Sequence, residues 1–407
     1  MIDNDRMNQL VKSFFEDHDH GREAMQNATV TENICFINYL ENNCIPKAKE
    51  NENEFDMQYF TEYDIHFRML TLEKIMKLPK FWVVISRATG HFFTMNRAVI
   101  VLVDNSEAQF LVDSLNEKNF EVEIREIGNE EFLSMMEDLH RLGVRGVEFT
   151  DGKLRPLIIP RETIHKTDKP KFTTNPKLYI EALVFLQEAH KFGKDGKSIG
   201  VNADSPIIEA MREATYLVPA IIQSKQGDQM QIKYPFLNTN VEGQKILPVM
   251  TDHKEFEYFF QSPVMKSYAE LPKEQRICIE LPFVEVYRVF STDDLFAIAI
   301  NPMGINLICN EGLMGQAAKG VSLTNNPNIK VEKNGEVIQF PEKPEEKENQ
   351  PESTDVLRRK VLLHFIETQK DIIEKNKAVD TDEARAKVKK AEDKLKDFEK
   401  QLEALDE

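Results

Sequence analysis

The apolar residues of the first 46 positions repeat at the spacing of helix faces. Two stripes have this spacing: Leu10, Val11, Phe14 and Phe15, then Val30, Ile34, Ile37 and Leu40. Residues 1–46 are therefore predicted to be N-terminal helices, with Pro46 ending the second one because proline interrupts a helix interior. The polar residues 47–56 predict a loop, and residues 71–78 predict a short amphipathic helix.

Residues 47–160 form a predicted unit in which short apolar runs alternate with amphipathic runs. Its predicted strands are 81–86, 98–103, 120–127, 144–149 and 155–159, and its further helices are 107–115 and 130–142. Residues 98–103 are uniformly apolar, so we expect a strand buried on both faces. One of Asp104, Asn105 and Ser106 is expected to cap the helix at 107.

A second unit of the same kind is predicted at residues 205–325, after a helical connector at 161–204 that contains a helix at 176–192. Its predicted strands are 216–223, 230–235, 246–250, 277–281, 296–300 and 305–309, and its helices are 206–214 and 254–261. Thr251 or Asp252 is expected to cap the helix at 254. Residues 301–304, which read Asn-Pro-Met-Gly, predict a turn.

The two units share one order of elements, which indicates an internal duplication. Aligning their central segments places residues 101–105 opposite residues 248–252, so that Leu102 lies opposite Val249. Direct identity between the two segments is slight. Two unrelated domains with a similar order of elements are the alternative.

The sequence pattern changes again near the C-terminus, first in composition and then in the spacing of apolar residues. Residues 326–355 are rich in charge and proline and are interpreted as a charged linker. Beyond it a heptad pattern comprises Ala384, Val388, Ala391, Leu395, Phe398, Leu402 and Leu405. With a preceding apolar stripe that includes Leu357, Val361 and Phe365, it predicts a helical hairpin or coiled coil at 356–407. Pairing within the chain is favoured, and a homodimer through these helices is the alternative.

The predicted fold is therefore α+β: two mixed-sheet α/β units with a C-terminal helical hairpin. The net charge of −17 argues against nucleic acid and anionic membrane as partners and favours a basic partner protein. No signal peptide is visible, and no apolar run approaches the ~20 residues of a membrane span. The four cysteines show no zinc-ligand spacing, so we expect buried free thiols and a cytoplasmic location.

Few residues of the sequence are candidates for metal binding, phosphate binding or catalysis. His18 and His20 are the densest candidates for a metal, and a solvated helix end or loop accounts for them better, so no metal or cofactor is expected. The loop GKDGKS at 193–198 lacks the spacing of a phosphate loop. His253 lacks any recognisable catalytic motif around it, and Cys309 has apolar or acidic neighbours that disfavour a thiolate.

Four residues at the predicted strand-to-helix turns are the binding candidates: Thr251, Asp252, Asn301 and Pro302. Such turns place backbone N–H groups and capping side chains at one sheet edge. Capping and turn formation account for the same residues without a ligand.

The second unit also carries three short motifs of one known family. They are YLVP at 216–219, LPVMTD at 247–252 leading into Phe256, and IAINP at 298–302. Residues 205–317 thereby resemble the N-terminal domain of the SseB family (enhanced serine sensitivity protein), with Met250 and Asp252 where that family usually has Phe and Ser. The first unit resembles a diverged copy that lacks the Asn-Pro turn. Because the family's molecular role is poorly defined, the resemblance implies a fold and no reaction.

The sequence therefore favours a non-catalytic cytoplasmic protein that acts as a protein-interaction or regulatory module. An enzyme or small-ligand-binding protein with a pocket at the turns of the second unit is the alternative. The two hypotheses differ in whether His253, Thr251 and Asn301 converge on one concave site.

Overall fold

The computed structural model describes residues 4–16, 18–164, 172–194, 196–226, 229–238, 244–292 and 295–321, with isolated positions between 370 and 396. The described chain divides into two compact units. The first contains Met1–Pro79, Leu154–Leu157 and the isolated C-terminal positions, and the second contains Lys80–Lys153 and the described residues from Ile158 to Val321. The predicted α+β class is confirmed, while the linker and the helical hairpin lie outside the described residues except for those isolated positions.

The first unit is helical. Its elements are α1 (Asn4–Glu16), α2 (His18–Asn27), α3 (Val30–Tyr39), η1 (Leu40–Cys44), α4 (Ile45–Glu50) and α5 (Glu54–Met76). Phe14 lies at the centre of its core, with its ring centroid 5.0 Å from those of Phe36 and Tyr63 and 5.7 Å from that of Phe67. Edge-to-face packing of this kind adds to the burial of the rings. Thr29 caps α3 in a reciprocal capping box with Glu32.

Pro46 does not end a helix, contrary to the prediction. It lies in the first turn of α4, directly after the π-helix η1, in which the Ile45 N–H donates to the Leu40 carbonyl. A proline ring has no N–H and clashes with the carbonyl four residues earlier, and the wider π turn accommodates both defects. The helix therefore continues to Glu50, and the predicted helix at 71–78 is the end of the much longer α5.

The second unit begins with a mixed sheet, here called the first sheet. Its strands are β1 (Lys80–Ser86), β2 (Thr94–Met95), β3 (Ala98–Leu102), β4 (Val122–Gly128), β5 (Gly146–Thr150) and β6 (Leu157–Pro160). They run in the order β4-β1-β3-β5-β6, with β2 also paired to β3. Every residue of β3 is buried, as the uniformly apolar sequence predicts.

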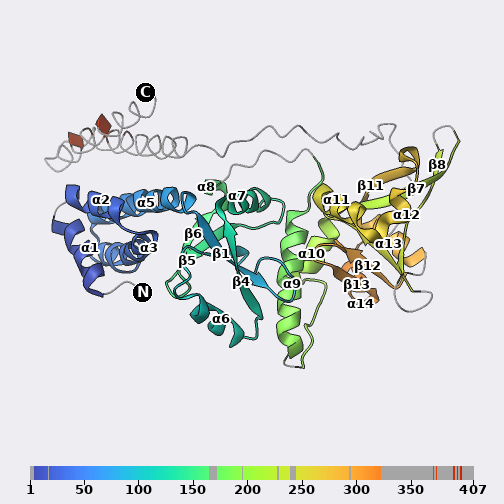
Figure 1. Cartoon of the computed structure of the whole chain (residues 1–407), viewed down its shortest axis with the longest axis horizontal. Helices are drawn as coiled ribbons and strands as arrows, with labels where there is room; N and C mark the ends of the chain where they lie inside the picture. The colour runs from blue at the N-terminus through green and yellow to red at the C-terminus, as the bar shows by residue number, and fades with distance from the viewer. Residues whose placement is uncertain are drawn as a thin grey trace. The chain divides into compact units, whose positions relative to one another are not determined.

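Helices cover both faces of the first sheet. They are α6 (Ala108–Asn116), α7 (Asn129–Asp138) and the short α8 (Arg161–Ile164). Figure 1 shows α6 and α7 on opposite sides of the strands. Leu115 of α6 packs against Val84 and Leu102, whereas Phe132 of α7 stacks on Phe81 with ring centroids 3.9 Å apart. None of Asp104, Asn105 and Ser106 is the N-cap of α6, which is Glu107; Asp104 instead accepts from the Ser106 N–H.

Two helices, α9 (Pro176–Lys194) and α10 (Pro206–Glu213), lead to the second sheet. Its strands are β7 (Thr215–Gln226), β8 (Gln229–Lys233), β9 (Leu237–Asn238), β10 (Lys245–Val249), β11 (Arg276–Pro282), β12 (Ala297–Ile300) and β13 (Leu307–Asn310). A reciprocal pair of backbone hydrogen bonds between Leu217 and Met250, of 2.9 and 2.8 Å, joins β7 to the end of β10. The strands form a four-stranded sheet, β13-β12-β10-β9, and a three-stranded sheet, β11-β7-β8, and this single bridge joins the two into what is here called the second sheet.

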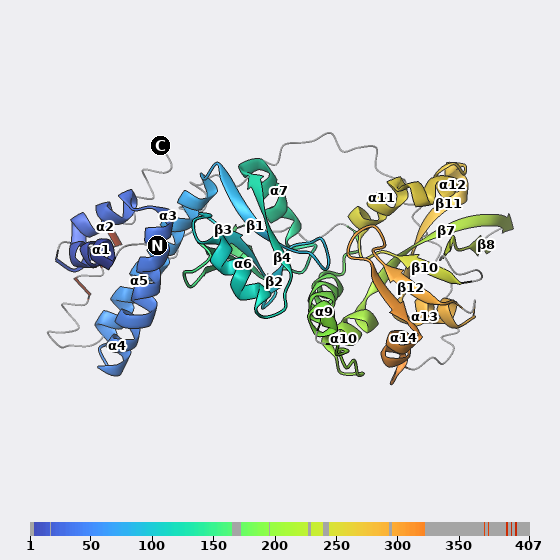
Figure 2. The ribbon, with the colours of Figure 1, turned by 60° about the horizontal axis from the view of Figure 1, so that its bottom comes forward.

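The helices of the second sheet are α11 (His253–Gln261), α12 (Lys266–Ala269), α13 (Phe283–Thr292) and α14 (Glu311–Ala318), with short 3-10 turns η2 (Pro263–Met265) and η3 (Lys273–Gln275). Figure 2 shows β10 and β12 between α11 on one side and α14 on the other. Neither α13 nor α14 was predicted from the sequence.

Counted through the Leu217–Met250 bridge, the path β11-β7-β10-β12-β13 has the same order as the path β4-β1-β3-β5-β6 of the first sheet, and three corresponding pairs have the same sense. The pairs β1–β3 and β7–β10 are antiparallel, and the pairs β3–β5 and β10–β12 are parallel. The edge pairs β1–β4 and β7–β11 are both antiparallel. A duplication predicts this shared topology.

The predicted alignment of residues 47–160 with residues 205–325, each of which contains one of the two sheets, is wrong by one residue. Leu102 pairs with Trp82 and packs under α6, and Met250 pairs with Leu217 and packs under α11. Leu102 is therefore equivalent to Met250 and not to Val249. Side chains alternate between the two faces of a sheet, so a slip of one residue exchanges the faces. Because both faces of β3 and β10 are apolar, the sequence pattern did not reveal the slip. The corrected offset places Asp104 opposite Asp252.

Candidate functional site

The end of β10 supplies the first two candidate residues. Thr251 and Asp252 follow the last residue of β10 and are 0% and 2% exposed. Asp252 is the N-cap of α11, and its Oδ1 accepts a hydrogen bond of 3.1 Å from the Glu255 N–H. The capping role predicted for Asp252 is confirmed.

Asn301 lies beside Thr251 because β10 and β12 are parallel neighbours with Val249 opposite Ile300. The Thr251 N–H donates to Asn301 Oδ1, and Asn301 Nδ2 donates to Thr251 Oγ1, both at 2.9 Å. The Asn301 carbonyl accepts from the Gly304 and Asn306 N–H groups, which closes the predicted turn. Asn301 has a φ of 50°, a left-handed conformation that asparagine tolerates better than most residues.

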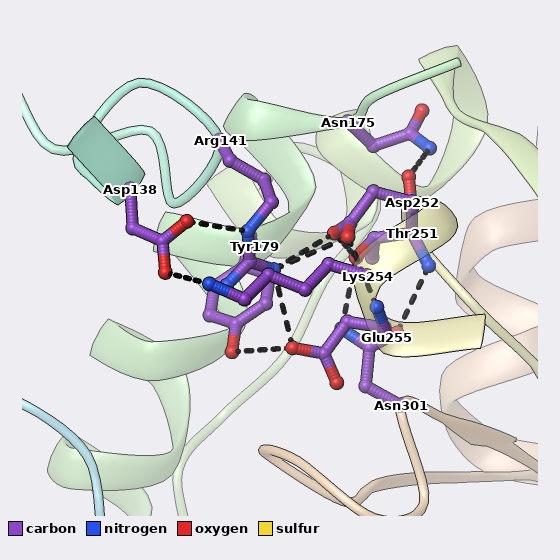
Figure 3. A network of polar contacts seen from close by, with 9 residues as sticks. All are labelled: Asp138, Arg141, Asn175, Tyr179, Thr251, Asp252, Lys254, Glu255 and Asn301. Atoms are coloured by element: carbon purple, nitrogen blue, oxygen red, sulfur yellow. Dashed lines mark hydrogen bonds and ion pairs between the residues drawn. The ribbon is translucent and has the colours of Figure 1, made fainter. Parts of the chain in front are cut away.

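The structure therefore brings Thr251, Asp252 and Asn301 into one hydrogen-bonded group (Figure 3). Thr251 Oγ1 links the other two, since it donates to Asp252 Oδ2 at 2.7 Å. Pro302 is half-buried in the adjacent turn and contributes no side-chain hydrogen bond, because its ring has no polar atom.

Arg141, which the sequence did not single out, binds this group from the segment after α7. Its Nη1 lies 3.1 and 3.2 Å from the two carboxylate oxygens of Asp252 and 3.2 Å from Glu255 Oε1. The guanidinium also lies 5.4 Å from the ring centroid of Tyr179 of α9. Burial opposes the charge of Arg141, yet the nearby Asp252 and Asp138 raise its pKa above the ordinary value. The arginine is therefore firmly charged.

Glu255 is the second carboxylate of the cluster and is 3% exposed. Its Oε1 accepts from Tyr179 Oη at 3.1 Å as well as from Arg141. Burial and the neighbouring Asp252 raise the pKa of Glu255, while Arg141 opposes the shift. Oε2 is buried and has no hydrogen-bond partner among the described residues. The Gly304 backbone packs directly against it, so a side chain at 304 would displace the carboxylate.

Further polar contacts surround the cluster (Figure 3). Asn175, which precedes α9, donates through Nδ2 to the Thr215 and Thr251 carbonyls at 2.8 and 2.6 Å. Lys254 of α11 forms an ion pair with Asp138 of α7. These contacts tie the first sheet, α9 and the second sheet to one set of side chains.

Two histidines lie near the cluster. The ring of His91 is 6.3 Å from that of Tyr179, and burial lowers its pKa. His253 is the first residue of α11, and its ring lies 4.7 Å from that of Phe172. His253 Nε2 is buried without a hydrogen-bond partner among the described residues.

Cys309 is fully buried in β13, and burial raises the pKa of its thiol to about 12. A thiolate nucleophile at this position is therefore strongly disfavoured. In the described part of the chain, the His, Cys, Asp and Glu side chains form no group of three or more that could hold a metal ion. The side chains of His18 and His20 lie outside that part.

The site as a whole is a buried set of ion pairs and hydrogen bonds. Most of its polar groups bind one another. Of its members, Arg141 and Tyr179 carry no sequence signal that relates them to Asp252 or Glu255. The spacing Asp252-x-x-Glu255 is a capping-box pattern and could have drawn attention to Glu255. Its side chain instead faces Arg141 and Tyr179.

Comparison with known proteins found no matching family model, no matching curated protein and no matching solved structure. Among the described residues, no helix combines the length and the apolar character that crossing a membrane requires.

Proposed function

We propose that this chain is a non-catalytic protein-interaction module. The observation that carries the proposal is the complete burial of Thr251, Asp252 and Asn301, whose polar atoms bind one another and Arg141. A ligand could reach these atoms only by breaking buried hydrogen bonds. Each broken bond would leave a buried polar group unpaired, which is unfavourable in free energy. The raised pKa of Cys309 supports the same conclusion.

The free edge of β13 is the proposed contact surface. An edge strand offers unpaired backbone groups to an extended segment of another protein, and proteins usually protect such edges with charge or proline. The edge strands β4, β8 and β11 carry charged residues, β9 has only two residues, and β6 ends at Pro160, whereas β13 reads Leu-Ile-Cys-Asn. Ile308 on β13 is 39% exposed, and Phe296 and Met303 nearby in sequence are 46% and 44% exposed.

The proposed occupant is an extended basic segment of a partner protein, because the chain has a net charge of −17. The C-terminal hairpin predicted at 356–407 is the second proposed surface. A cytoplasmic location belongs to the same proposal and is supported by Cys35, Cys44, Cys278 and Cys309, none of which forms a disulfide. The SseB resemblance of residues 205–317 supports an assignment to that family as a further proposal.

The test compares Ile308→Lys with Val264→Lys, a matched control at an exposed apolar position on η2 that is 54% exposed. Proteins captured by the full chain would be identified by mass spectrometry, and the leading one would be purified for calorimetric titration. We expect Ile308→Lys to weaken its binding at least 10-fold and Val264→Lys to leave it unchanged. Equal affinities of both variants and of the unaltered chain would contradict the assignment of β13.

A small-ligand-binding protein is the second candidate, and one observation favours it. The buried Glu255 Oε2 has no partner among the described residues, as a carboxylate awaiting a hydrogen-bond donor would. A panel of polar metabolites would be tested for a shift of Tm of the unaltered chain and of Glu255→Gln. A shift that disappears in Glu255→Gln would support this candidate, and no shift with any compound would remove it.

A further inference from the structure

The helical first unit carries an apolar patch on its surface, here called the α1–α5 patch and formed by Phe15, Met57 and Phe60. Phe15 at the end of α1 is 42% exposed, and Met57 in the first part of α5 is 37% exposed. The rings of Phe15 and Phe60 are 5.9 Å apart, so the two helices contribute to one continuous area. Exposed apolar side chains that cluster in this way mark a surface that another segment covers.

The helical unit is also strongly acidic. Residues 1–79 contain 15 Asp and Glu against 8 Lys and Arg. The segment 356–377 near the other end of the chain has the opposite balance, with 6 Lys and Arg against 3 Asp and Glu. The two parts are therefore complementary in charge.

The same C-terminal segment supplies apolar side chains at helical spacing, with Leu357, Val361 and Phe365 four residues apart. Two of its positions are described. Ile373 is half-buried and Lys370 is exposed, which is the difference expected for an amphipathic segment with one covered face. Both positions belong to the same compact unit as Met1–Pro79.

We propose that residues 356–377 of this chain bind the acidic helical unit at the α1–α5 patch. The 34 residues 322–355 can span on the order of 110 Å when extended, so the connection does not prevent this contact. Because the two partners are covalently linked, the segment acts at an effective concentration that a separate molecule rarely reaches. The inference goes beyond the proposed function and does not rest on it, and it assigns the stripe of Leu357, Val361 and Phe365 to the α1–α5 patch in place of the hairpin pairing predicted from the sequence.

Hydrogen exchange of the full chain, followed by mass spectrometry of peptides from 356–377, tests the proposal. The test variant is Phe15→Lys with Met57→Lys, which puts like charge opposite the basic segment. The control is Met95→Lys with Phe110→Lys, two positions of the second unit that are 39% and 50% exposed. Retained protection of α3 shows that the helical unit of each variant is folded.

We expect the segment to be protected in the unaltered chain and in the control, and to exchange at least 10-fold faster in the test variant. Protection should not change when the protein is diluted 20-fold. Protection that falls on dilution would show that the segment binds a second copy and would overturn the proposal. Equal exchange in the test variant and the unaltered chain, or a segment unprotected in the unaltered chain, would overturn it as well.

Discussion

Thr251 and Asn301 exchange two hydrogen bonds of 2.9 Å across the ends of the parallel strands β10 and β12. The pair connects the cap of α11 to the left-handed turn after β12, and both side chains are 0% exposed. An asparagine suits this position because it tolerates the positive φ and supplies both an acceptor and a donor.

Asn301→Ala should lower the free energy of unfolding by roughly 2–4 kcal/mol, because it leaves buried groups of Thr251 unpaired and forces alanine into a left-handed conformation. Asn301→Gly removes the same bonds without that strain and should be about 1 kcal/mol less harmful. Urea unfolding measures both. Asn306→Ala is the control, since Asn306 has a similar φ of 48° but an exposed side chain. A loss for Asn306→Ala as large as that for Asn301→Ala would contradict the role of the buried bonds.

Arg141→Met should destabilise the second unit by roughly 3–5 kcal/mol, because Asp252 and Glu255 would be left as buried carboxylates without their cation. Arg288→Met is the matched control: Arg288 binds Glu285 within α13 but is 43% exposed, and such surface pairs contribute only ~0–1 kcal/mol. Thermal unfolding of both variants is the measurement. Similar small shifts of Tm in both would show that the Arg141 cluster is not buried in solution.

Glu148 should make the stability of the protein depend on pH. It is a 3% exposed residue of β5, and burial raises the pKa of its carboxyl group above the value in the unfolded chain. The folded state therefore binds this proton more tightly, so the contribution of Glu148 is fully present below about pH 4 and is lost as the pH rises through the folded-state pKa.

Glu148→Gln keeps the shape without the charge and should be more stable than the unaltered chain at pH 7, with no difference near pH 4. Unfolding curves across this pH range measure the effect, with the exposed Glu257→Gln as control. Equal stability of Glu148→Gln and the unaltered chain at pH 7 would show that Glu148 is not desolvated.

Arg212→Lys should loosen the end of α14. Arg212 Nε and Nη2 donate to the carbonyls of Ala317, Gln316 and Lys319 at 2.8–2.9 Å, and Nη1 donates to the Ala203 carbonyl at 3.0 Å. These carbonyls are at or near the helix terminus and have few other partners, and a lysine ammonium cannot reproduce the geometry of the guanidinium. We expect a loss of roughly 2 kcal/mol and faster exchange of the α14 amides. Arg87→Lys, at a 61% exposed side chain, should change neither quantity.

The strands were the most predictable part of the fold. β1 and β3 were found because a short run of apolar residues between polar ones is typical of a buried strand. Helix ends were less predictable where the backbone departs from regular geometry, as at Pro46, since a π turn leaves no signature in residue type. The one-residue error between the two sheets arose because both faces of β3 and β10 are apolar.

The candidate site was predictable in part. Thr251, Asp252 and Asn301 were found because caps and turns use characteristic residues next to strands. Arg141 and Tyr179 were not found, since Arg141 is 111 residues from Asp252 and only the packing of the chain brings them together. The partner, the family assignment and the choice between a hairpin within the chain and a homodimer stay predictions.

Asp252 has two roles at once, as the cap of α11 and as the principal partner of Arg141. The two contacts share one carboxylate, so loss of either one weakens the geometry that supports the other. The first turn of α11 and the segment that carries Arg141 should therefore be thermodynamically coupled. Heating should then melt the two sheets in a single cooperative calorimetric transition, and Arg141→Met should broaden that transition as it lowers its Tm.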